Sequence, residues 1–330
     1  MSVSDALWIA KTWTDTQGES RPGISVSQHC RNVGYVAKAL LERIPGVVRE
    51  MLPEGIITRV ACHDVGKLSP GFQGMIRKYA PFSDPVPEIP ENLLRELRVE
   101  GNESHHETIS EAALVRHIGR YSWKVVVGRH HARYRSPKKD LCGTYGGSWW
   151  SERRQSLIQD LISEFGPLPS SEDRPTDEQL DIATGFLVIA DWIGSDEHFF
   201  TSEPHVPESS GALSQKAENI LDAMGWYSPE AIRENGFREL FGIDGEALPV
   251  QKSLEQVAIR PGIYVLEAPM GIGKTEAALL AAHRLPSPGI NRGIYFALPT
   301  RTTSERIHER VESFIRNGFK GDPRVRLLHG

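Results

Sequence analysis

Residues Ile56 to Leu68 read IITRVACHDVGKL, an apolar stretch in which His63 is directly followed by Asp64. Imidazole nitrogens and carboxylate oxygens are the atoms that first-row divalent metal ions take as ligands in proteins. A single histidine–aspartate pair is common, so it indicates a metal site only where further ligands accompany it. We expect this stretch to form a helix that holds both side chains among apolar residues.

Further histidines and one aspartate occur in matching settings, each on an expected helix beside apolar residues. They are His29, His106, His130, His131 and Asp191. Any one of them, taken alone, is more often a hydrogen-bonded core residue than a ligand. As a set they favour a metal centre, because buried polar groups on several helices are costly without a common partner.

The helix expected at residues 104–115, opened by a Ser–Glu capping box, carries two adjacent histidines that compete for the site. His106 shares a face with Ile109 and Ala113, at positions i+3 and i+7, so we expect it to point inward. His105 lies on the more polar side, and we assign it to the surface. We assign three more histidines to the surface: His117, His198 and His205.

The histidine doublet lies at the end of a helix expected at residues 123–131. His130 and His131 follow Val126 and Val127 at helical spacing, so both are expected to project near one buried stripe.

Two carboxylates and one lysine complete the candidate site. Asp64 is one residue beyond His63, about 100° around a helix, so its carboxylate can lean to one side and bridge two metals. Asp191 ends the apolar run 186–190, where a carboxylate is costly unless a metal or another partner compensates. For Lys67 two roles are equally compatible with the sequence: neutralising a phosphate near the metals, or capping a helix C-terminus.

Composition sets the limits of the interpretation. A chain of 330 residues, 39% hydrophobic and 25% charged, is typical of a soluble protein with about two domains. No run approaches the ~18 apolar residues of a membrane helix, and three cysteines form no disulfide framework, which favours the reducing cytoplasm. With a net charge of −5, nucleic-acid binding has to rely on local patches. One such patch follows the doublet: Arg129, Arg133, Tyr134, Arg135, Lys138 and Lys139.

The pattern along the chain changes near residue 250. Before it, we expect helices at 26–41, 56–68, 104–115, 123–131 and 178–193, with loops at 81–92 and 165–176 and a connector at 201–214. After it, we expect strands at 263–268, 294–298 and 325–328, with helices at 276–284 and 302–315 between them. Strand, helix, strand, helix, strand is typical of a parallel α/β sheet.

Ala268-Pro-Met-Gly-Ile-Gly-Lys-Thr275 follows the first expected strand and is typical of a phosphate-binding loop. The small residues, Gly271 and Gly273 among them, let backbone N–H groups approach phosphate, while Lys274 supplies charge and Thr275 can ligate Mg²⁺. Gln251, 23 residues before Lys274, can read an adenine edge, although a surface glutamine is nearly as compatible with the sequence.

These residues resemble a known family, the CRISPR-associated nuclease–helicase of type I interference. The segments similar to its HD-type nuclease domain are His63-Asp64-x-Gly-Lys67, His106-Glu107, His130-His131, Ala190-Asp-Trp192 and Ser195-Asp196. The segments similar to the start of its superfamily 2 helicase core are Gln251, Glu267 to Ala277 and Ala297 to Arg301. The order of these motifs is more specific than any one of them.

The resemblance implies a mainly α HD-type phosphohydrolase domain at residues 1–225, a linker at 226–249, and the incomplete first RecA-like P-loop lobe at 250–330. It implies two-metal phosphodiester hydrolysis with Asp64 and Lys67 as catalytic residues. One metal is expected on His29, His63, Asp64 and Asp191, and the other on Asp64, His106, His130 and His131. Histidine-rich sites suit Fe, Mn, Co, Ni or Zn.

The family further implies cleavage of single-stranded DNA, the displaced non-target strand, after recruitment by the Cascade surveillance complex, together with ATP- and Mg-driven 3′-to-5′ translocation. The 330 residues contain no acidic Asp-Glu-x-His box, so we expect an N-terminal fragment whose nuclease works without ATP hydrolysis. Two alternatives remain: an HD phosphohydrolase acting on nucleotides or small phosphodiesters, and a DNA-binding or docking module whose metal is structural.

Overall fold

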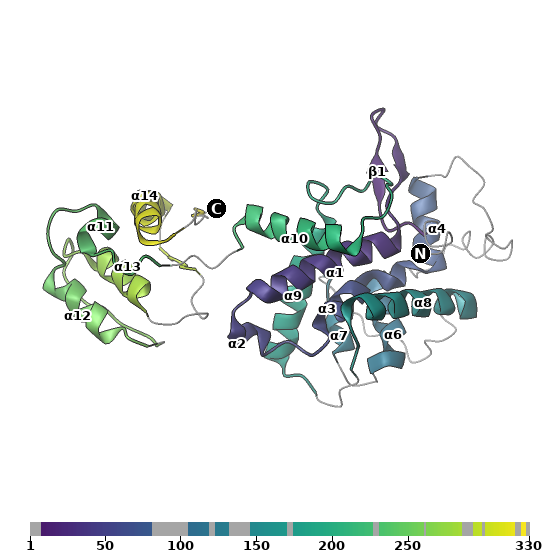
Figure 1. Ribbon diagram of the computed structural model, residues 1–330, viewed down its shortest axis with the longest axis horizontal. Coiled ribbons are helices and arrows are strands. Elements are labelled where there is room, and N and C mark those ends of the chain that lie inside the picture. Colours follow the sequence, from purple (N-terminus) through teal and green to yellow (C-terminus); the bar gives the residue numbers. More distant parts are fainter. Residues whose placement is uncertain are drawn as a thin grey trace. The chain divides into compact units, whose positions relative to one another are not determined.

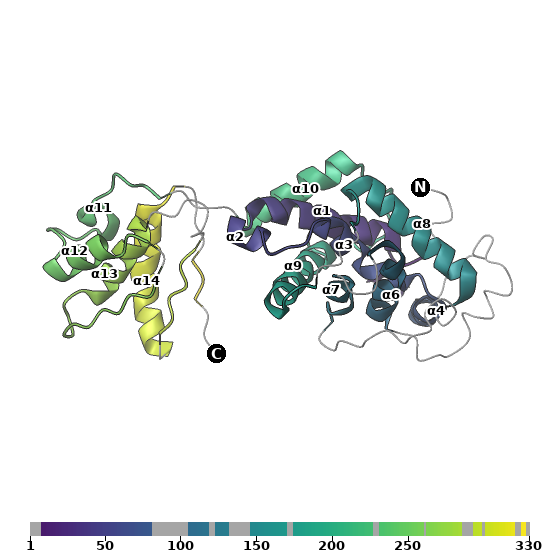
Figure 2. The same ribbon diagram turned by 90° about the horizontal axis from the view of Figure 1, so that it is seen from below.

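The computed structural model divides the chain into two compact units, residues 1–44 with 48–220, and residues 45–47 with 221–330 (Figures 1 and 2). The residues that it describes are 8–80, 105–118, 123–131, 146–169, 174–226, 231–260, 262–285, 293–298, 301–320 and 325–327. Within these ranges no helix is both long and apolar enough to cross a membrane.

The chain up to residue 224 is mainly helical, which confirms the predicted class of its first domain. Its α-helices are α1 Val26–Arg43, α2 Gly46–Arg49, α3 Ile56–Ala61, α4 Pro70–Tyr79, α6 His106–Ile118, α7 Lys124–Gly128, α8 Gly147–Phe165, α9 Asp177–Ser195 and α10 Ser210–Met224. The described residues stop at position 80 and resume at His105. The capping serine expected at position 104 and the loop expected at 81–92 therefore lie outside them.

Helix α1 lies at the centre of the first unit and packs against α3 and α9 (Figure 2). Its N-terminus is fixed by a capping box, in which the Ser25 hydroxyl accepts from the Gln28 N–H and the Gln28 side chain accepts from the Ser25 N–H. Gly194 of α9 lies directly against Val33 of α1, where a larger side chain would collide with the α1 backbone. The close approach of the two helices brings His29 on α1 near Asp191 on α9.

The helix expected at residues 56–68 is not continuous, so this prediction is wrong in its second half. Helix α3 ends at Ala61, and Cys62–Lys67 form a 3₁₀ helix, η2. A 3₁₀ helix turns about 120° per residue instead of about 100°, which changes the relative directions of His63 and Asp64. The tighter turn lets Gly66 lie against α6, where its N–H donates to Ser110 Oγ at 2.8 Å.

The helix expected at residues 123–131 is also shorter than predicted. Helix α7 ends at Gly128, a residue with poor helix propensity, so His130 and His131 lie beyond its end. The helical spacing that we used for this doublet is therefore wrong. Arg129 is an ion-pair partner of Asp181 at 3.7 Å. The rest of the predicted basic patch, Arg133, Tyr134, Arg135, Lys138 and Lys139, lies outside the described residues.

A short β-hairpin that the sequence analysis did not predict precedes α1. Strand β1 (Thr12–Thr14) pairs antiparallel with β2 (Ser20–Pro22). At its base the Gly23 N–H donates to the Lys11 carbonyl at 2.9 Å, and the Ile24 N–H donates to Ser202 O at 3.0 Å. The first bond closes the hairpin, and the second attaches it to the segment that follows α9.

The second unit has its own core. It contains α11 Phe237–Phe241, α12 Pro249–Val257, α13 Lys274–Arg284 and α14 Arg301–Gly318. Its fully buried residues Leu240, Leu279, Leu280 and Phe314 form one cluster. Helix α11 thus lies within the predicted linker 226–249 and contributes Leu240 to this core; the predicted boundaries themselves stay a prediction.

The strands expected in the second unit are not formed among its described residues. Residues 262–268, 293–298 and 325–327 have no regular secondary structure, and Ile263, Val265 and Tyr295 are almost fully exposed. A strand requires a neighbouring strand to satisfy its backbone N–H and C=O groups, and these segments form no such ladder. Local β propensity identified the segments but could not supply their pairing.

The contact between η2 and α6 can be tested with glycine substitutions. A Cβ added at Gly66 would collide with the His106 carbonyl and the Ser110 N–H, so we expect Gly66→Ala to lower the free energy of unfolding by roughly 1–3 kcal/mol or more. In α9, a Cβ at Gly185 has no heavy atom within 4 Å, so Gly185→Ala should leave stability unchanged or raise it by roughly 0.5–1 kcal/mol. Urea unfolding followed by tryptophan fluorescence measures both. Equal stability of the two variants would contradict this packing.

Candidate metal centre

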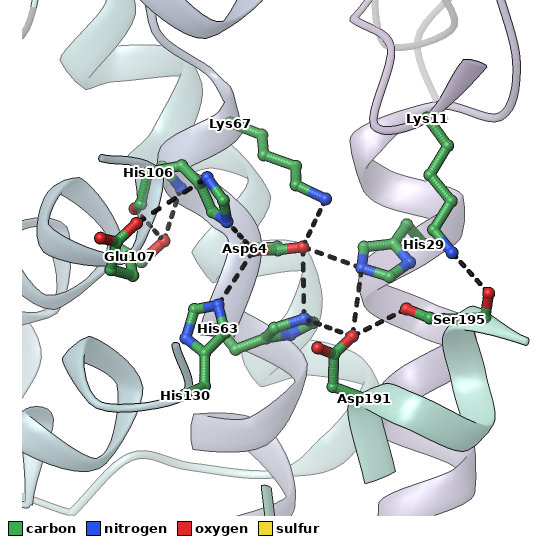
Figure 3. Close-up of polar contacts among 12 residues, drawn as sticks. Lys11, His29, His63, Asp64, Lys67, His106, Glu107, His130, Asp191 and Ser195 are labelled. Atoms are coloured by element: carbon green, nitrogen blue, oxygen red, sulfur yellow. Dashed lines mark hydrogen bonds and ion pairs between the residues drawn. The ribbon is translucent and has the colours of Figure 1, made fainter. Parts of the chain in front are cut away.

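The carboxylate of Asp64 lies at the centre of the first unit's polar cluster and is almost fully buried (Figure 3). Its Oδ2 atom lies 2.7 Å from Lys67 Nζ, 2.9 Å from His29 Nε2 and 3.3 Å from His63 Nε2. Two elements thus meet at one carboxylate oxygen, because α1 supplies His29 and η2 supplies His63, Lys67 and Asp64 itself.

The second oxygen of Asp64 faces a different set of side chains. Its Oδ1 atom lies 3.1 Å from His106 Nε2 and 3.5 Å from His130 Nε2. The ring of His131 adjoins this set, since its Nε2 lies 3.0 Å from His106 Nε2. Helix α6 therefore directs His106 inward, and the segment after α7 adds two imidazoles.

Asp191 on α9 lies on the Oδ2 side of the site. Its Oδ1 atom lies 3.2 Å from His63 Nε2 and 3.8 Å from His29 Nε2. The Ser195 hydroxyl, one turn further along α9, donates to the same carboxylate oxygen at 2.8 Å. Asp191 is thus oriented by its own helix toward the two histidines.

Backbone carbonyls fix the orientation of two histidine rings. His63 Nδ1 lies 2.9 Å from Val60 O, and His130 Nδ1 lies 2.6 Å from Val127 O. A carbonyl only accepts, so each Nδ1 carries the proton and the Nε2 of the neutral ring presents a lone pair to the site. This second hydrogen bond is typical of histidines that ligate metals.

The donor atoms fit divalent cations. Among the described residues, His63 Nε2, Asp64 Oδ1 and His130 Nε2 are buried and form no hydrogen bond of regular geometry, although other atoms of the site lie 3.1–3.5 Å from them. A bound cation would satisfy these atoms. Two groups of three residues each have ligand atoms that all lie within 4.8 Å of one another inside the group. One set is His29, His63 and Asp64, and the other is His106, His130 and His131. Imidazole and carboxylate donors of this kind suit first-row transition metals.

The electrostatics of the site favour positive charge at the carboxylates. Burial raises the pKa of Asp64, but the charges of His63 and Lys67 outweigh it and hold this pKa well below its usual value. Burial lowers the pKa of His63, but Asp64 and Asp191 outweigh it and raise the pKa to about 10. Burial and Lys67 lower the pKa of His29 to about 4, so that ring is neutral near pH 7. A cation that binds between the carboxylates therefore competes with a proton on His63.

Two further site assignments are refined by the geometry. Lys67 contacts the Asp64 carboxylate, and its side chain is mostly buried, so it does not act as a simple cap on helix carbonyls. The side chain of His105 is more exposed than that of His106, its Nδ1 lies 3.2 Å from a Glu107 carboxylate oxygen, and it belongs to neither group of clustered ligand atoms. The structure therefore brings together all seven predicted ligands and excludes His105 from the cluster.

The phosphate-binding loop of the second unit has the backbone that its glycines imply. Gly271 and Gly273 have φ of +80° and +78°, a region that favours glycine, and α13 begins at Lys274. Gln251 is buried and its Nε2 donates to Gly273 O at 3.2 Å. Lys274 Nζ donates to Ala268 O at 2.5 Å and to Pro269 O at 2.8 Å, so the ammonium group lies over the loop.

Sequence reasoning missed the roles of Ser195 and Lys11. Ser195 lies four residues after Asp191, so helical spacing could have indicated the contact between them. Lys11 Nζ donates to Ser195 O at 2.6 Å, across 184 residues of sequence. Only the unpredicted hairpin brings that lysine to the site, so no local signal identified it.

Two relatives share sequence with this chain over nearly its whole length. The chain is 30% identical to a CRISPR-associated nuclease/helicase Cas3 of Streptococcus thermophilus, over 99% of this chain and 40% of the relative. It is 28% identical to a CRISPR-associated endonuclease/helicase Cas3 of Thermus thermophilus, over 100% of this chain and 38% of the relative. The chain thus spans about two fifths of the length of these relatives.

A solved structure of Cas3 from T. fusca has the same fold over 99% of this chain and 39% of its own, with a TM-score of 0.73 at 22% identity. The family model described as "Cas3, HD domain" matches residues 8–200, which is more than half of the chain and includes the positions of the seven predicted ligands. This match confirms the resemblance and the HD-type fold of the first domain. The chain belongs to the Cas3 HD-domain family.

Proposed function

We propose that the first unit hydrolyses phosphodiester bonds in single-stranded DNA at a centre of two divalent transition-metal ions. The observation that carries the proposal is the position of Asp64 between two sets of imidazoles, one facing each carboxylate oxygen. A carboxylate that presents its two oxygens to two ligand sets is suited to bridging two cations.

The two ligand sets divide the ions between them. His29, His63, Asp64 and Asp191 would hold one ion, and Asp64, His106, His130 and His131 the other. A pair of divalent ions supplies Lewis-acid activation of water and stabilises charge on the attacking and leaving oxygens of an in-line displacement. The ligand chemistry suits Fe, Mn, Co, Ni or Zn.

Lys67 has a distinct role in this proposal. Its ammonium group, 2.7 Å from Asp64 Oδ2, orients the carboxylate and lies 5.4 Å from the centre of the Phe72 ring. Because it carries positive charge at the edge of the ligand sets, it can also offset the charge of a phosphodiester that approaches them.

A feature beside the site supports a polymeric substrate. Trp192 follows the ligand Asp191 on α9 and is 71% exposed, so its indole ring is accessible to a ligand. Exposed aromatic rings stack the bases of single strands, and stacking tolerates every base. We therefore favour a DNA strand over a mononucleotide, and propose the displaced non-target strand, delivered by the Cascade complex in the cytoplasm.

The second unit supports a separate nucleotide function. The loop with Gly271, Gly273, Lys274 and Thr275 at the start of α13, joined to Gln251, suits ATP with Mg²⁺. We propose that it serves ATP-driven 3′-to-5′ translocation. None of these residues belongs to the metal centre, so hydrolysis of DNA there should not require ATP.

The two-metal proposal predicts a specific effect of removing Asp64. Asp64→Ala should lose both ions together and abolish cleavage, because one carboxylate serves both ligand sets. His105→Ala is the matched control, because His105 precedes a ligand, contacts Glu107 and belongs to neither group of clustered ligand atoms. Elemental analysis of the purified proteins, paired with a DNA cleavage assay, measures both effects. Retention of one ion by Asp64→Ala would show that this carboxylate does not bridge.

The substrate proposal predicts that Trp192→Ala weakens binding of single-stranded DNA by about 10-fold, since stacking on an aromatic contributes roughly 1–3 kcal/mol per base. Hydrolysis of a small chromogenic phosphodiester should stay unchanged. Tyr79→Ala removes a similarly exposed aromatic from α4, which carries none of the ligands, and serves as the control. The assays contain Mn²⁺ and no ATP. If Trp192→Ala loses turnover of the small phosphodiester in the same proportion as its affinity for single-stranded DNA, the alternative of a nucleotide phosphohydrolase is favoured.

A further inference from the structure

Lys11 lies at the base of the β-hairpin, immediately before β1, with its side chain directed at the C-terminal end of α9 (Figure 3). Its Nζ donates to the carbonyl oxygen of Ser195, the last residue of that helix, at 2.6 Å. The final carbonyls of a helix have no intrahelical partner, and a lysine there satisfies one of them and complements the helix dipole.

The same residue of α9 connects Lys11 to the metal centre. The Ser195 hydroxyl donates to Asp191 Oδ1 at 2.8 Å, and that oxygen faces His63 Nε2 at 3.2 Å. Lys11, Ser195 and Asp191 thus form a chain of contacts that runs from the hairpin through the last turn of α9 to one ligand set.

The backbone of Lys11 is itself held in place. Its carbonyl accepts from the Gly23 N–H at 2.9 Å, and a side chain at Gly23 would collide with that carbonyl and with Ser202 O. The hairpin therefore presents the lysine from a fixed backbone, which is what a residue that orients another group requires.

The charge of Lys11, taken alone, would weaken the binding of a metal ion, whereas orienting Asp191 would strengthen it. Its ammonium group is half-buried and close enough to the site that its pKa is lowered, first by burial and then by the charge of Lys67, while Asp191 raises it. A positive charge so placed repels a bound cation. Charge and orientation therefore make opposite predictions for the affinity of the metal, and one experiment separates them.

We propose that Lys11 is a positioning residue for Asp191: through Ser195 it fixes the last turn of α9 and so sets the affinity of one metal position, the one made by His29, His63, Asp64 and Asp191. This inference rests on the proposed two-metal function. The other position takes His106, His130 and His131 from α6 and the segment after α7, none of which contacts Lys11. The effect is therefore selective for one ion of the pair.

The test is a calorimetric titration of Mn²⁺ into the metal-free full chain, which yields the stoichiometry and the affinity of each site. We expect Lys11→Met to weaken one of the two sites by about 10–100-fold, the usual effect of removing a group that orients a ligand, and to leave the other site within about 2-fold. Lys11→Arg keeps a donor for the Ser195 carbonyl and should restore most of the affinity. Lys38→Met, which removes an exposed lysine from α1, is the control and should match the unaltered protein.

Ser195→Ala removes the hydroxyl that contacts Asp191 and should weaken the same site. Because both substitutions break one chain of contacts, the double variant should lose less than the product of the two single effects. Ser195→Ala also provides the test if Lys11→Met fails to fold, because undiminished Mn²⁺ affinity of Ser195→Ala would overturn the proposal.

Other outcomes separate this proposal from the function on which it rests. Two sites of unchanged or tighter affinity in Lys11→Met would overturn the positioning role and leave the two-metal centre in place. Equal weakening of both sites would also overturn it, because the effect would not be specific to Asp191. If the unaltered protein binds fewer than two ions, the two-metal function itself is wrong.

Discussion

The Asp64 carboxylate is the group on which the rest of the first unit depends. An ionised carboxylate with 3% of its residue surface exposed is costly to bury unless cations and hydrogen-bond donors surround it. Here a lysine and four imidazoles do so, and they come from α1, η2, α6 and the segment after α7. The helices are thus arranged to bring their polar side chains to one point in an apolar interior.

This constraint explains local features that stability alone would not favour. A 3₁₀ turn is less favourable than an α-helix. In η2, however, this turn places the side chains of His63 and Lys67 against the same oxygen of Asp64. Gly66 within it permits contact with the α6 backbone, which sets the distance from Asp64 to His106. Irregular backbone of this kind is typical of functional sites, where surrounding contacts hold it in place.

Much of the candidate site could be predicted from the sequence because polar residues within apolar helical faces are conspicuous. His29, His106 and Asp191 were selected in this way, and each lies at the site. The doublet was selected by an incorrect helical argument, since α7 ends at Gly128 and backbone contacts to Val127 orient His130 instead. Helical periodicity identified which residues turn inward but not where each helix ends.

The features that sequence could not predict depend on contacts between distant segments. The hairpin that carries Lys11 has strands of only three residues, too short for a periodic signal. In the second unit, Ile263 and Tyr295 lie in segments with the composition of strands, but strand formation depends on pairing that composition does not encode. Local chemistry therefore predicted the ligands better than it predicted the groups that position them.

The bridging role of Asp64 is the central claim, and anomalous X-ray diffraction from crystals of the Mn²⁺-loaded protein tests it most directly. The account predicts two anomalous peaks, about 3.5–4 Å apart as in two-metal sites generally, with one Asp64 oxygen bound to each. One peak should also be bound by Asp191, and the other by His131. A single peak, or two peaks of which one has no bond to Asp64, would contradict the account.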